Sequence, residues 1–153
     1  PTQVVTREQM ASFLVRAAHL QPAAEHHPGS YYFPDCDPAS PHDDDIGTLW
    51  EAGITAGCDD GGALYCPDQQ VTREQMASFL VRAADLQPAA DHHPGSYYFS
   101  DVSASSPHDD DIGTLRETGI TRGCDPEGTL YCPEGDVLRD QMAVFLARAF
   151  LGY

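Results

Sequence analysis

Histidine and aspartate side chains gather in two segments of the sequence, and both residue types can bind metal ions. Each segment contains two adjacent histidines, then an aspartate, then a third histidine followed by three aspartates. The candidate ligands are Asp43, Asp45, Asp109, Asp111, His42 and His108. Carboxylate oxygens suit Ca²⁺ and imidazoles suit Zn²⁺, but neither an EF-hand nor an H-E-x-x-H spacing is present. We therefore expect no cofactor beyond a possible structural Ca²⁺. The simpler interpretation, which we favour, is a solvated helix start beside loop histidines.

Arginine is the only strongly basic residue type in a chain of net charge −16. The eight arginines include two sets that recur every 66 residues: Arg7, Arg73 and Arg139, and Arg16, Arg82 and Arg148. A guanidinium group can hold a carboxylate through two parallel hydrogen bonds, so the first set is a candidate anion site. Pairing with nearby carboxylates such as Glu8, Glu74 or Asp140 is the alternative for both sets.

Four of the five cysteines bracket two short, similar segments, Cys58 with Cys66 and Cys124 with Cys132. We expect each pair to form a disulfide, as in proteins of oxidising compartments, in preference to reduced thiols or a zinc site. Closing so short a ring stabilises by about 2.5 kcal/mol on a loop-entropy estimate. Cys36 has no cysteine counterpart, because Val102 occupies the matching position. It is expected to be a small buried apolar residue or, alternatively, to bond a second chain.

Other chemistries find little support in the sequence. There is no G-x-S-x-G and no glycine-rich phosphate loop, so we expect no enzyme. The acidity argues against binding to nucleic acid or to an anionic membrane surface. No apolar stretch approaches the roughly 18 residues of a membrane span. A non-catalytic exported protein is the class that remains.

The elements that must position these residues are repeated. VTREQMASFLVRAA occupies residues 5–18 and 71–84, and a variant, VLRDQMAVFLARAF, occupies residues 137–150. Residues 1–66 and 67–132 are identical at 51 of 66 positions without a gap, and residues 133–153 begin a third copy. We divide the chain into residues 1–20, the final helix of a truncated first repeat, followed by repeats at residues 21–86 and 87–153. A chain that opens within a repeat is expected to be an excerpt of a longer one.

One repeat predicts a long helix, a loop, a shorter helix and a small hairpin. Thr6 and Gln9 form a Thr-x-x-Gln capping box, which is incomplete in the third copy because Leu138 replaces the threonine. Apolar residues at i, i+3, i+4 and i+7 follow the cap, and proline ends the helix. A second, shorter helix is expected within residues 40–55. Three aspartates lie in its first turn, and Gly53 is a candidate C′ glycine at its end. The Asp/Gly turn at residues 57–66 predicts a β-hairpin. The fold class is therefore mainly α with short β-hairpins, in tandem repeats of 66 residues.

The combined order YYFSDV, DIGTL, GIT-x-GC, LYCP and VTREQM resembles the S-layer homology repeat. The likeness is greatest to the cysteine-bearing form of high-GC Gram-positive bacteria, and it covers nearly the whole chain. The resemblance implies extracellular or cell-surface attachment to a cell-wall polysaccharide, and three repeats packed about a pseudo-threefold axis. It places the glycan-binding arginine of the family at Arg7, Arg73 and Arg139, with Gln9, Gln75 and Gln141 close by. Tyr31 and Tyr97 are expected to supply a flat aromatic surface for the glycan.

Two functions follow as hypotheses. In the first, the protein is a cell-envelope module that binds a wall polysaccharide or surface layer through grooves between repeats. In the second, it is a structural protein whose near-identical repeats stack into an extracellular filament or layer, because a contact that does not close generates an open array. The second hypothesis needs neighbouring copies of the repeat as partners. Neither needs nucleic acid or a membrane span.

Overall fold

Hydrogen-bonded caps start the long helices of the chain. A computed structural model describes residues 2–153. Thr6 caps α1 (Arg7–Ala17) and Thr72 caps α4 (Arg73–Ala83), each in a reciprocal capping box with the glutamine three residues on. The third long helix, α7 (Arg139–Leu151), keeps only half of this box: Gln141 Oε1 accepts the Leu138 N–H at 3.2 Å, and leucine has no oxygen to return the bond. Both predictions about the caps are confirmed.

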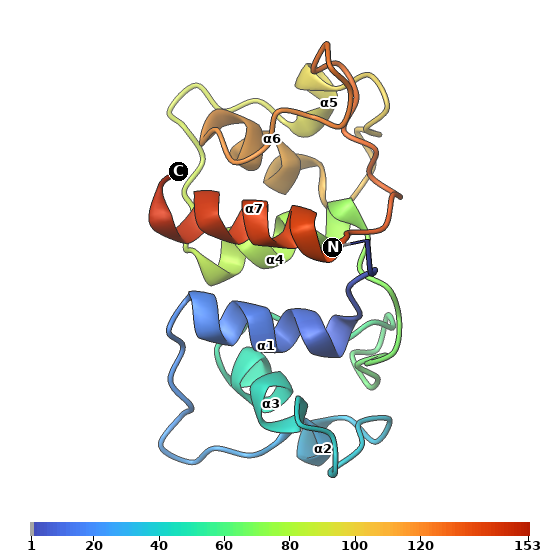
Figure 1. Cartoon of the computed structure of the whole chain (residues 1–153), viewed down its shortest axis with the longest axis vertical. Helices are drawn as coiled ribbons and strands as arrows, with labels where there is room; N and C mark the ends of the chain where they lie inside the picture. Colours follow the sequence, from blue (N-terminus) through green and yellow to red (C-terminus); the bar gives the residue numbers. More distant parts are fainter. Residues whose placement is uncertain (1) are drawn as a thin grey trace. The chain divides into compact units, whose positions relative to one another are not determined.

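Four shorter helices complete the helical structure of the described residues: two pack directly against α1 and α4, and the other two pack against those two. They are α2 (Gly29–Tyr32), α3 (Asp43–Glu51), α5 (Gly95–Tyr98) and α6 (Asp109–Glu117). The chain divides into two compact units, Val5–Val71 and residues 2–4 with Thr72–Tyr153. In the first unit α1 lies against α3, and in the second α4 lies against α6 (Figure 1). Gly53 has φ +70°, the left-handed conformation predicted after the second helix.

Close approach of the 26–29 loop to α3 fixes the orientation of the short helix. A Cβ on Gly47 would lie 2.0 Å from the His27 carbonyl oxygen, so only glycine fits there. The α3 helix lies against α1, and Ile46 and Leu49 of α3 and Met10 of α1 are all buried. Large buried aliphatic side chains of this kind supply most of the stabilisation of a small unit.

The predicted β-hairpin is not found among the described residues. Residues 57–66 form turns and no strand, and Cys58 N–H to the Leu64 carbonyl is the bond that closes the loop, at 2.7 Å. The Asp59 carboxylate accepts the Leu64 N–H at 2.8 Å, a donor that a paired strand would use in its ladder. The segment is therefore a disulfide-closed loop held by a side-chain cap. The described chain is mainly α-helical.

Isolated backbone bridges connect the segment before one long helix to the start of another. Gln70 bridges Thr6, Asp136 bridges Thr72, and Val4 bridges Leu138. Each bridge is antiparallel and continues in a hydrogen bond to the first residue of the helix, as in Arg7 N–H to Gln69 O at 2.8 Å. These bonds satisfy N–H groups that a helix start leaves without partners.

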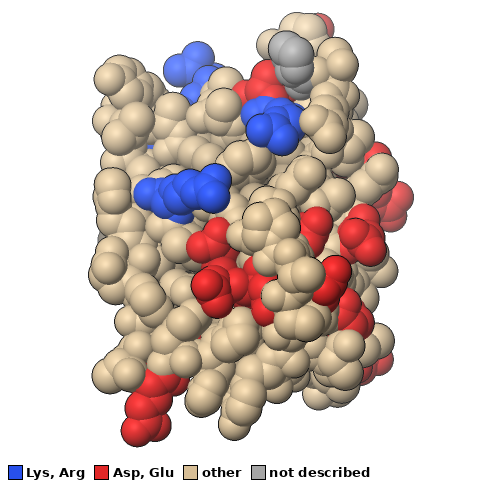
Figure 2. All heavy atoms as spheres, turned by 60° about the horizontal axis from the view of Figure 1, so that its bottom comes forward, with Lys and Arg blue, Asp and Glu red and all other residues tan. Residues whose placement is uncertain are grey.

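The surface reflects the composition. Figure 2 shows many acidic side chains and few arginines on one face of the molecule. None of the described helices is long and apolar enough to cross a membrane.

Candidate functional site

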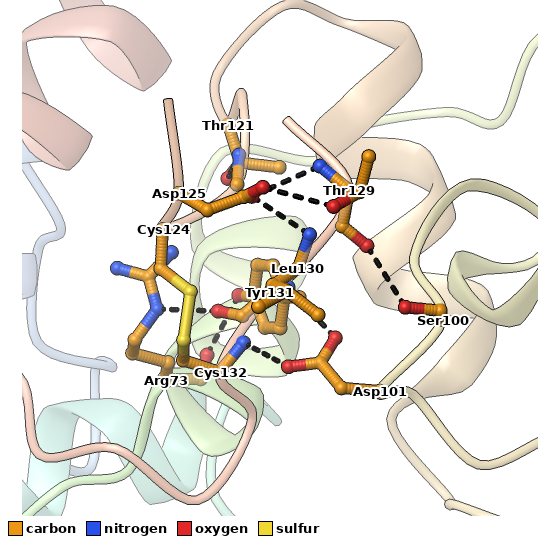
Figure 3. Close-up of a disulfide and its surroundings, with 11 residues drawn as sticks. Arg73, Ser100, Asp101, Thr121, Cys124, Asp125, Thr129, Leu130, Tyr131 and Cys132 are labelled. Atoms are coloured by element: carbon orange, nitrogen blue, oxygen red, sulfur yellow. Dashed lines mark hydrogen bonds between the residues drawn. A yellow bond between two sulfur atoms is a disulfide. The ribbon is translucent and has the colours of Figure 1, made fainter. Parts of the chain in front are cut away.

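Two disulfides join the predicted cysteine pairs, Cys58 with Cys66 and Cys124 with Cys132. Figure 3 shows the second disulfide with the Asp125 carboxylate beside it in the same loop. Asp125 accepts the backbone N–H groups of Thr129 and Leu130 at 2.9 and 2.8 Å. These bonds to the charged form hold the pKa of Asp125 below its usual value. The disulfide and the hydrogen bonds to Asp125 together hold this loop in one conformation.

The motif arginines of the first two repeats hold these loops to the long helices. Arg73 Nε donates to the Tyr131 carbonyl oxygen at 2.8 Å, and the Tyr131 hydroxyl donates back to the Arg73 carbonyl oxygen at 2.8 Å (Figure 3). Arg7 and Tyr65 make the same reciprocal pair, at 2.7 and 2.9 Å. Each guanidinium also lies over the tyrosine ring, 4.8 to 4.9 Å from its centroid.

Both of these arginines are buried. Arg7 is 3% exposed and Arg73 is 7% exposed, and burial lowers the pKa of both guanidinium groups. The hydrogen bonds described above go to backbone carbonyls rather than to the carboxylates that the sequence suggested. We conclude that Arg7 and Arg73 are structural clamps between a helix start and a disulfide loop. Arg139, in contrast, has an exposed side chain.

A cavity of about 330 Å³ opens beside the second clamp, within the unit that contains α4, α6 and α7. We call it the arginine pocket. It is lined by Arg73, Thr121, Arg122, Gly123, Cys124, Gln141, Val144, Phe145 and Arg148. Residues 121–124 come from the start of the disulfide loop, and the last four residues come from α7.

Three guanidinium groups therefore meet at one cavity in a strongly acidic chain. Arg148 is fixed by a hydrogen bond from Nη1 to the Ile120 carbonyl oxygen at 3.0 Å, and Arg122 is exposed. Phe145 lies under the Arg73 guanidinium, 5.3 Å from the ring centroid. Guanidinium groups held by protein contacts can receive a carboxylate or phosphate with little reorganisation. The pocket suits an anionic ligand.

Sequence reasoning missed Arg122. Ala56 occupies the matching position in the preceding repeat, so Arg122 lies outside the recurring arginine sets. The exchange of Ala56 for Arg122 is one of the 15 differences between the segments 1–66 and 67–132, and it adds a cation to an acidic chain. Only the fold brings it beside Arg73 and Arg148.

The predicted glutamines divide between two roles. Gln9 Oε1 and Gln75 Oε1 accept the N–H groups of Thr6 and Thr72 at 3.4 and 3.3 Å, as capping residues do. Gln141 caps Leu138 in the same manner and also lines the arginine pocket. The predicted tyrosines, Tyr31 on α2 and Tyr97 on α5, are exposed and are not among the residues that line it.

Hydrogen bonds within the protein occupy the candidate metal ligands. Asp43 accepts the Ser30 N–H and hydroxyl at 2.6 and 2.7 Å. Ser12 donates to Asp45 and lies 2.7 Å from His42 Nδ1. The same bonds recur in the next repeat for Asp109, Asp111 and His108. Ser12 and Ser78 are buried, and their bonds join each long helix to the short helix that packs on it.

The described residues contain one set of three potential ligand atoms close enough to share an ion, in Asp101, Cys124 and Cys132. Both sulfur atoms of that set belong to the disulfide. Asp101 also accepts the N–H groups of Tyr131 and Cys132 at 2.8 and 2.7 Å. Cys36 is free and buried, and burial raises the pKa of its thiol to about 12.

Glu51 and Glu117 anchor the loops before α2 and α5. Glu51 accepts hydrogen bonds from His26 Nδ1 at 2.8 Å, the His27 N–H at 2.7 Å and the Tyr32 hydroxyl at 3.0 Å. Burial by itself raises the pKa of this carboxyl group, but the hydrogen bonds outweigh it and bring the pKa to about 2. In Glu117 the bonds from His92 and His93 dominate, and the pKa is also about 2.

These carboxylates predict a loss of stability in acid. Their folded-state pKa lies below the ordinary value of 4.5, so their contribution is fully present above that pH and disappears as the pH falls from 4.5 towards 2. We expect the melting temperature, followed by circular dichroism, to fall over this interval. The variant Glu51→Gln/Glu117→Gln should show a smaller fall than the wild type. Equal slopes for the two proteins would contradict the assignment.

No protein-family model matches the chain, and comparison with curated proteins finds no significant relative.

Proposed function

We propose that this chain is a non-catalytic extracellular module that binds an anionic cell-wall polysaccharide through the arginine pocket. The observation that carries the proposal is the meeting of Arg73, Arg122 and Arg148 at one cavity of about 330 Å³. With a net charge of −16, the chain repels anions over most of its surface, so an acidic ligand needs a site where cations are concentrated. The other lining groups, Gln141, Thr121 and Val144, suit a ligand with hydroxyl groups and apolar edges.

Two further features support an envelope location for this binding. The disulfides are typical of proteins that mature in an oxidising compartment, and there are two in a chain of 153 residues. The resemblance to S-layer homology repeats links the same sequence order to attachment at a cell wall. That resemblance also implies that a motif arginine contributes to glycan binding. In this proposal Arg73 has that role, together with Arg122 and Arg148.

The pocket can be tested without damaging the fold, because Arg122 is exposed. Arg122→Ala introduces alanine, which is also the residue at the matching position of the preceding repeat, Ala56. A charged hydrogen bond contributes about 1.5–3 kcal/mol, so we expect the dissociation constant for an acidic wall polysaccharide to rise about 10- to 100-fold. Isothermal titration calorimetry measures this change directly.

The matched control is Arg116→Ala, which removes an exposed arginine from α6 outside the pocket. It changes the net charge by the same amount and should alter the affinity less than threefold. Equal losses for the two variants would mean that general electrostatic attraction, rather than the pocket, holds the polymer.

A further inference from the structure

A histidine and a tyrosine stack face to face on the surface of each of the first two repeats. His27 and Tyr31 lie 4.0 Å apart between ring centroids with an interplanar angle of 13°, and His93 and Tyr97 lie 4.1 Å apart at 16°. Each tyrosine is 66% exposed although one face of its ring is covered by the histidine. Each stack therefore presents a flat aromatic face to solvent.

Contacts with neighbouring residues hold each ring of the first stack in place. The Tyr31 N–H donates to the Pro28 carbonyl oxygen at 3.0 Å, and the ring meets Tyr32 edge to face at 5.1 Å. Glu51 accepts the His27 N–H and the Tyr32 hydroxyl, so one carboxylate holds the histidine of the stack and the tyrosine that the Tyr31 ring meets edge to face. A tyrosine that is ordered before binding loses little conformational entropy when a ligand covers it.

The surroundings of the first stack are acidic. Pro28, whose carbonyl oxygen accepts the Tyr31 N–H, also lines a hollow of about 260 Å³ together with Pro38, Ser40, Pro41, Asp43 and Asp44. The Asp44 side chain is 83% exposed. Carboxylates accept hydrogen bonds from hydroxyl groups and repel anions, which is the opposite selectivity to that of the arginine pocket.

We propose that the His27–Tyr31 and His93–Tyr97 stacks are binding platforms for uncharged sugar rings. The apolar C–H face of a pyranose would cover the exposed face of the tyrosine, and its hydroxyl groups would reach the neighbouring carboxylate. This site is distinct from the arginine pocket and takes a different class of ligand.

The test uses an array of uncharged and acidic bacterial oligosaccharides, probed with the whole chain. We expect the wild type to bind uncharged members and Tyr31→Ala/Tyr97→Ala to lose at least tenfold in affinity for them, since an aromatic face contributes energy of about that size. Tyr31→Phe/Tyr97→Phe keeps both ring faces and should retain most of the affinity. Because both tyrosines are exposed, all variants should keep the melting temperature of the wild type.

A local readout is available in the first repeat. Trp50 is the only tryptophan of the chain and lies 5.7 Å from Tyr32, so an oligosaccharide on the first platform should change its fluorescence. The platform is overturned if the wild type binds no uncharged member of the array, or if the alanine variant binds them as the wild type does. Arg122→Ala tells the two proposals apart, because it should weaken binding to acidic members and leave binding to uncharged members unchanged.

Discussion

Replacing Arg73 with alanine will destabilise the fold by about 3 kcal/mol, the range expected when a buried, hydrogen-bonded charged group is removed. Arg73 is 7% exposed, donates to the Tyr131 carbonyl oxygen and lies over two aromatic rings. Alanine leaves that carbonyl without its donor and opens a void beside Phe145. Chemical denaturation in urea, followed by circular dichroism, gives the change in the free energy of unfolding.

Arg139→Ala is the matched control, because Arg139 occupies the same position of the repeat with an exposed side chain. It should change the free energy of unfolding by less than about 0.5 kcal/mol. Arg7→Ala should behave like Arg73→Ala, since Arg7 makes the same reciprocal pair with Tyr65. If Arg73→Ala unfolds with the stability of the wild type, Arg73 is a ligand-binding residue only, and the clamp is wrong.

Removing the second disulfide will lower both the stability of the fold and the affinity for the acidic polysaccharide. Cys124→Ser/Cys132→Ser releases the ring that carries Cys124 on the wall of the arginine pocket. Loss of the loop constraint costs about 2.5 kcal/mol. Freeing the loop should also weaken binding of the acidic polysaccharide at least tenfold, because Arg122 and the Tyr131 anchor of Arg73 are then no longer held in place.

The first disulfide provides the control for this experiment. Cys58→Ser/Cys66→Ser opens a loop of the same length, and neither cysteine lines the arginine pocket. It should lower stability by a similar amount and leave the affinity for the acidic polysaccharide within about threefold of the wild type. Equal losses of affinity in the two double variants would show that global loosening, and not the wall of the pocket, accounts for the effect.

Local sequence rules predicted the helices and their caps because the interactions involved are local. Thr6 and Gln9 lie three residues apart, and Cys58 and Cys66 lie eight apart, so spacing alone was enough to identify the cap and the disulfide. The hairpin was predicted from the same kind of rule and is wrong. There the Asp59 side chain binds the Leu64 N–H that a strand would have used, and turn chemistry alone does not distinguish these two outcomes.

The role of the motif arginine depended on a distant partner. Arg7 and Tyr65 are separated by 58 positions in the sequence, and nothing in either segment indicates that a tyrosine carbonyl will meet the guanidinium. The arginine pocket also depends on residues far apart in the sequence, because its lining comes from both the disulfide loop and α7. The sequence supplied the idea of an anion site at Arg73, and the structure replaced the single arginine with a group of three.

The central claim is that the protein binds an anionic wall polymer rather than itself. Co-sedimentation of the purified protein with cell-wall sacculi, before and after their polysaccharide is stripped, tests it most directly. We expect the protein to pellet with intact sacculi and to remain in the supernatant both with stripped sacculi and when spun alone. Pelleting without any wall would contradict this claim and establish the self-assembling array instead.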